Sequence, residues 1–134
     1  MSKPSLTLSV RLRHPRIPAA DISAGMGVKA TVARSVGKPK RSNGDKPAAD
    51  RNAETYWAIR LIERKDAELT AAIETAASWL QDRNSYISRF RAKGGSIEFY
   101  VSLSCDGHFA EELPSAVLER IVKLGVYLSV EVFT

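Results

Sequence analysis

Three segments of this chain alternate apolar and polar residues, and their order constrains the fold more than any other feature. The segments are 54–62, 96–104 and 126–133, and amphipathic stretches with helical spacing lie between them. Alternation with period two is typical of a strand with one buried face, whereas i, i+3, i+4 spacing is typical of a helix packed on a core. The second half of the chain is therefore predicted to pack as one unit of strands and helices.

A fourth alternating segment near the N-terminus completes the predicted sheet. Apolar residues at positions 6, 8, 10 and 12 alternate with polar or basic ones, and Pro15 ends the strand because proline cannot donate to a ladder. With 134 residues, the chain is predicted to be a single domain over 1–134. The expected fold is α+β, with about four strands in a mainly antiparallel or mixed sheet and helices packed on one face.

The helices of this fold are predicted over 18–25, over the stretch between Lys65 and Gly94 with a break at Asn84, and over 115–124. Glu111 and Glu112 precede the last helix and are predicted to favour the positive end of its dipole. The side chains predicted to line the core are Leu8, Val10, Trp57, Ile59, Ile73, Leu80, Phe99, Val101, Leu118, Ile121, Leu128 and Val130.

The positive charge of the chain is concentrated in its first 53 residues. These residues include eleven lysines and arginines but three acids, whereas 54–134 include nine basic and twelve acidic residues. The first part therefore carries a net charge of +8 and the second −3. Such an asymmetry favours an anionic partner without naming it.

Basic side chains on the first strand, in its exit loop and in the segment 37–50 form a candidate patch for that partner. The segment 37–50 has no large apolar residue and is rich in glycine and proline, so it is predicted to be a mobile basic loop. Tyr56 and Tyr100, on outward strand faces, are the candidate partner-facing aromatics. The patch residues are Arg11, Arg13, Arg16, Lys38, Lys40, Arg41 and Lys46.

Cys105 and His108 are the candidate pair for nucleophile or metal chemistry. A thiolate activated by His108 would support an enzyme, and the two side chains would supply half of a zinc site. A turn built on Asp106-Gly107 beside a half-buried cysteine explains the same residues, and we favour that interpretation. We therefore predict no catalytic residue, no metal ligand and no cofactor.

A set of short motifs resembles the bacterial domain-of-unknown-function family 4279. The family's Leu-Gly-Ile-x-Pro-Thr turn corresponds to 26–31, where Ala30 replaces the proline, and its basic glycine loop corresponds to 37–39. Its tryptophan strand corresponds to 56–59, and its closing Leu-Gly corresponds to Leu124-Gly125. The resemblance implies a fold and a bacterial setting, and it assigns no reaction.

The single cysteine and the N-terminal residues predict a cytoplasmic protein. Cys105 has no second cysteine with which to form an internal disulfide. The N-terminal residues lack the apolar stretch of a signal peptide, and no apolar run reaches the ~20 residues that span a bilayer. No membrane partner is therefore expected.

These observations together predict a small, soluble, non-enzymatic binding domain. The first expectation is a protein–protein interaction, as in an accessory or immunity-type protein by analogy. Nucleic-acid binding through the basic N-terminal half is the alternative, and an enzyme or metal site around Cys105 and His108 is the third hypothesis. A homo-oligomer is left open.

Overall fold

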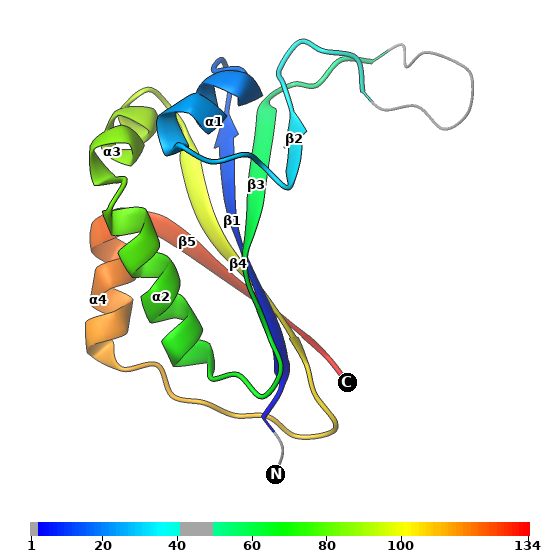
Figure 1. The fold of residues 1–134 in the computed structure, drawn as a ribbon, viewed down its shortest axis with the longest axis vertical. Coiled ribbons are helices and arrows are strands. Elements are labelled where there is room, and N and C mark those ends of the chain that lie inside the picture. The colour runs from blue at the N-terminus through cyan, green and yellow to red at the C-terminus, as the bar shows by residue number, and fades with distance from the viewer. Residues whose placement is uncertain (1–2, 41–49) are drawn as a thin grey trace.

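The computed structural model describes residues 3–40 and 50–134. Within these ranges the chain forms one five-stranded sheet and four helices, which lie along one side of the sheet (Figure 1). The α+β class is thereby confirmed. In chain order the elements are β1 (Ser5–His14), α1 (Ala19–Met26), β2 (Val32–Arg34), β3 (Thr55–Arg64), α2 (Leu69–Gln81), α3 (Asn84–Ala92), β4 (Ser96–Ser104), α4 (Ser115–Leu124) and β5 (Val126–Phe133).

The sheet is mixed and has the strand order β2-β3-β1-β4-β5. The pairs β2–β3, β3–β1 and β1–β4 are antiparallel, whereas β4 and β5 are parallel and are connected through α4 as a crossover. The prediction of four strands was one too few. The missed strand, β2, has three residues, all exposed, which pair with 56–58 of β3, and so short a strand has no detectable alternation.

The core lies between the sheet and the helices. In β1 and β4 every second side chain is buried, and the buried sets of the two strands face the helices together with Trp57 of β3. The helices contribute Ile73 and Leu80 from α2, and Ile87 and Phe90 from α3. The predicted helical stripe of α2 is thus confirmed as a buried face.

Two predicted core residues are exposed. Leu118 and Val130 are each 44% exposed, whereas Val117, Ile121 and Leu124 form the buried stripe of α4. A ten-residue helix is about 15 Å long and an eight-residue strand about 26 Å. The helix therefore cannot cover the whole of β5, and exposure increases toward the C-terminal end of that strand.

A β-bulge in β3 changes which face its last residues occupy. Leu8 pairs with Ile62 and Ser9 with Arg60, so Leu61 is the extra residue on β3. The simple alternation of the sequence places Ile62 on the face of the strand that Tyr56 occupies, away from Trp57. The bulge instead brings Ile62 into the core.

Glu111 caps α2 rather than α4, contrary to the sequence prediction. Its Oε1 accepts a hydrogen bond from the Leu69 amide at 2.9 Å, and its Oε2 accepts from both the amide and the hydroxyl of Thr70 at 2.6 Å. These amides belong to the first turn of α2, where backbone donors lack helical partners. The connection between β4 and α4 is thereby tied to the start of a different helix.

Candidate functional site

The side of the sheet opposite the helices, which we call the open face, carries the tyrosines and most of the charged side chains of the strands. No described helix covers it, and the outward residues of β1, β3, β4 and β5 meet there in register. Arg11 lies directly across from Glu98, and Arg13 from Tyr56. The outward side chains on this face include Arg11, Arg13, Tyr56, Glu98, Tyr100, Tyr127, Ser129, Glu131 and Phe133.

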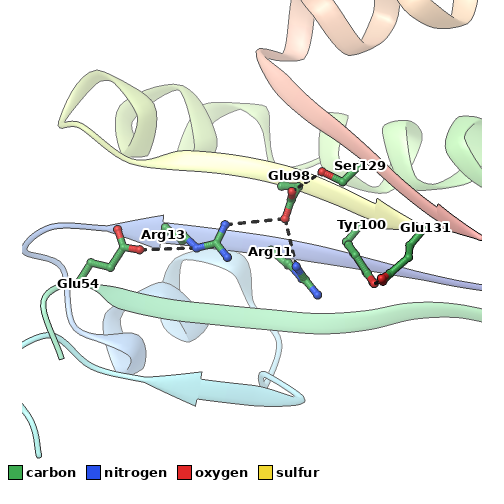
Figure 2. A network of polar contacts seen from close by, with 7 residues as sticks. All are labelled: Arg11, Arg13, Glu54, Glu98, Tyr100, Ser129 and Glu131. Carbon is green, nitrogen blue, oxygen red and sulfur yellow. Dashed lines mark hydrogen bonds and ion pairs between the residues drawn. The ribbon is translucent and has the colours of Figure 1, made fainter. Parts of the chain in front are cut away.

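Glu98 is the centre of a polar network on the open face (Figure 2). Its Oε1 lies 3.5 Å from Nη1 of Arg11 and 3.8 Å from Nη1 of Arg13. Its Oε2 accepts a hydrogen bond from the hydroxyl of Ser129 at 2.6 Å. Arg13 is also paired with Glu54, at 3.6 Å. One carboxylate therefore links three strands and partly neutralises two arginines.

Tyr100 is held by two contacts on the same face. The guanidinium carbon of Arg11 lies 3.8 Å from the centre of its ring, and its hydroxyl donates a hydrogen bond to Glu131 (Figure 2). This hydrogen bond, followed by burial, raises the pKa of Tyr100 above its usual value of 10. The phenol therefore remains a neutral donor at physiological pH, and one face of its ring is occupied.

A basic hollow of about 470 Å³ lies at the β2 side of the open face. Arg13, Arg34 and Lys40 line it together with Glu54 and Tyr56. The guanidinium carbons of Arg13 and Arg34 lie 5.2 and 4.7 Å from the centre of the Tyr56 ring. Three cations against one carboxylate give this hollow a net positive charge, which attracts negatively charged groups.

Backbone pairing fixes the positions of Arg34 and Lys40, the two cations of the hollow that do not come from β1. Arg34 ends β2 and lies opposite Tyr56 of β3. The amide of Lys40 donates to the carbonyl of Asp50 at 2.9 Å, and the carbonyl of Lys38 accepts from the amide of Asn52 at 2.9 Å. The described ends of the segment 37–50 are therefore held together in a ladder beside the hollow.

The structure brings together only part of the predicted patch. Arg13 and Lys40 line the hollow, and Arg11 lies further along the face in the Glu98 network. Arg16 donates to the carbonyl of Lys93 at 3.2 Å, at the end of α3, and Lys38 is exposed but is not part of the lining. The two remaining patch residues, Arg41 and Lys46, fall outside the described residues.

Cys105 and His108 do not form a nucleophile–base pair. The Cys105 Sγ lies 3.7 Å from the carbonyl oxygen of Gly107, and no hydrogen bond joins it to His108. The other histidine, His14, is buried next to Phe90, and its Nδ1 accepts hydrogen bonds from two backbone amides. Over 3–40 and 50–134, no group of three or more His, Cys, Asp or Glu side chains is arranged to hold a metal ion.

Sequence reasoning missed three residues that shape the open face: Arg34, Glu54 and Glu98. Glu98 occupies an outward position of a correctly predicted strand, so its place on the solvent-facing side of the sheet could be predicted from the alternation. Its pairing with Arg11 required knowledge that β4 is the neighbour of β1. Arg34 belongs to the strand that the pattern did not reveal.

Comparison of the chain with models of known protein families, with curated proteins and with solved structures finds no match. The resemblance to family 4279 therefore stays a prediction. Among the residues that the structure describes, no helix has the length and apolar character needed to cross a membrane.

Proposed function

We propose that this chain is a non-enzymatic protein-binding domain whose open face binds a protein partner that presents acidic side chains to the basic hollow. The observation that carries this proposal is the interleaving of carboxylates and guanidiniums around Glu98. A face of mixed charge complements another protein surface of mixed charge, because each group then finds an opposite partner.

The same charges are less suitable for nucleic acid. Phosphate binding depends on cations that are free to replace counterions, and Arg11 and Arg13 are already partly neutralised by Glu98. Bases would also need exposed aromatic rings for stacking. Guanidinium groups already occupy positions over the rings of Tyr56 and Tyr100.

The basic hollow has the geometry to receive one or two carboxylates. The planar guanidinium of Arg34 is exposed and binds a carboxylate through two parallel hydrogen bonds, while Lys40 adds a point charge at the rim. Tyr127 and Phe133, which are 68% and 51% exposed, add apolar contact area on the β5 side of the same face. Aromatic and arginine side chains are the groups that protein interfaces favour.

The test compares two probes of equal charge. A fluorescein-labelled peptide of glutamate and serine and a single-stranded oligothymidylate are titrated by anisotropy at several salt concentrations. The double variant Arg34→Ser/Lys40→Ser removes the two cations of the hollow that have no acidic partner among the described residues. Each lost charge pair costs about 0.5–1 kcal/mol, so the peptide should bind roughly fivefold to thirtyfold more weakly.

Arg64→Ser/Lys65→Ser is the matched control, because it removes the same charge from exposed positions at the opposite end of β3. The control should change peptide affinity less than twofold. Equal losses in both variants would show that the peptide senses only net charge and would overturn the proposal. Tight oligothymidylate binding at physiological salt, weakened by Arg34→Ser/Lys40→Ser with a salt slope shallower by roughly two, would establish the nucleic-acid alternative instead.

A further inference from the structure

The outer edge of β5 is unpaired among the described residues, since β5 is the last strand in the order β2-β3-β1-β4-β5. The amide of Cys105 donates to the carbonyl of Phe133 at 3.0 Å, so the backbone groups of Phe133 face β4. Backbone groups alternate in direction along a strand. Those of Leu128, Val130 and Val132 therefore point outward and are free to pair with another strand.

The sequence of β5 is nearly symmetric about Val130. On both sides of this residue the order is polar, apolar, aromatic. If two copies of β5 pair antiparallel about a two-fold axis at Val130, side chains of similar chemistry lie opposite each other over seven residues. The resulting pairs are Val130 with Val130, Ser129 with Glu131, Leu128 with Val132, and Tyr127 with Phe133.

The neighbouring registers are less favourable. Centring the axis on Glu131 places two carboxylates directly opposite each other, which is destabilising. Centring it on Ser129 sets Tyr127 against Glu131 and leaves Phe133 without a counterpart. The residues of β5 thus favour one register, in which the outward backbone groups of the two copies also exchange hydrogen bonds.

The exposed side of α4 extends the same surface. Arg120 donates to Ser78 of α2 at 3.2 Å, so this flank of α4 faces α2. At 100° per residue, Leu118 and Val122 lie on the opposite flank, and both are exposed. Because α2 packs on β1 and β3 while α4 packs on β5, that opposite flank faces the free edge of the sheet.

We infer that this chain forms a two-fold symmetric dimer in which the β5 strands of two copies pair antiparallel about Val130, giving one continuous ten-stranded sheet. The α4 helices of the two copies then lie on the same side of that sheet, with Leu118 and Val122 turned toward the dimer axis. The edge suits such an approach because Glu131 is the only charged side chain of β5. The open faces of both copies remain uncovered on the other side.

Light scattering after size exclusion, over micromolar to millimolar concentrations, tests the dimer. The wild-type chain should show twice its 14.7 kDa mass. Val130→Lys should raise the dissociation constant at least about tenfold, because each dimer loses its central apolar contact and gains two opposed like charges. Val32→Lys is the matched control: Val32 is 47% exposed on the other edge strand, and its substitution should leave the dimer intact.

Cross-linking tests the register independently of the dissociation constant. In a Cys105→Ser background, Val130→Cys should be joined by a short bis-maleimide, whereas Val32→Cys should not. A wild-type chain that is monomeric at every concentration would overturn the inference. So would a dimer that survives Val130→Lys, or one that is lost with Val32→Lys.

Discussion

Replacing Glu98 by glutamine removes the negative charge at the centre of the open face and keeps the size of the side chain. Glutamine retains one oxygen acceptor but presents an amide donor where the carboxylate had a second oxygen. One of the two contacts, with Ser129 or with the arginines, then loses its acceptor. Arg11 depends on Glu98 more than Arg13 does, because Arg13 also pairs with Glu54, whereas Glu98 is the one acidic partner of Arg11 among the described residues.

The expected loss in the free energy of unfolding follows from these contacts. Each half-exposed pair with an arginine contributes about 0.2–1 kcal/mol. The hydrogen bond from Ser129 to a charged acceptor is worth about 1 kcal/mol more than one to a neutral acceptor. Glu98→Gln should therefore destabilise the chain by about 2 kcal/mol, which urea unfolding at neutral pH resolves.

Glu63→Gln is the control, because among the described residues Glu63 pairs only with exposed Arg60, at 3.9 Å. This change should cost less than about 0.5 kcal/mol. The reasoning is refuted if the two variants are equally stable, because Glu98 would then contribute no more than an ordinary surface charge.

Two further predictions concern the pH dependence of stability. Burial alone would raise the pKa of Glu111, but the hydrogen bonds from Thr70 and Leu69 hold this pKa below its ordinary value of 4.5. The stability that the cap contributes should therefore be lost as pH falls below that value, and urea unfolding at acidic pH should show the loss. Glu111→Gln should remove both the pH dependence and about 1–3 kcal/mol of stability at neutral pH. Burial, with the nearby charges of Arg16 and Lys93, lowers the pKa of His14 below 6.5. The unfolded chain therefore binds the proton more readily, and the free energy of unfolding should decline as pH falls below 6.5. If His14→Asn left the slope of this free energy against pH unchanged over that range, the assignment would be contradicted.

The sequence by itself determined the class of the fold and most of its elements. Alternation in β1, β4 and β5 and the helical stripe of α2 are local patterns, because a strand or helix turns its side chains by a constant angle per residue. Gly125, with φ 69°, likewise ends α4 where the pattern predicts, because a left-handed residue suits glycine.

Only the tertiary structure decided which of these surfaces meet. The bulge at Leu61 moved Ile62 into the core, and the limited length of α4 left Val130 exposed. The pairing of Arg11 with Glu98 joins residues 87 positions apart, and no pattern along the chain encodes that β4 lies beside β1. Strand order and helix coverage depend on how the whole chain buries its apolar faces at once, so the charged face and the free edge of β5 emerge only from the assembled sheet.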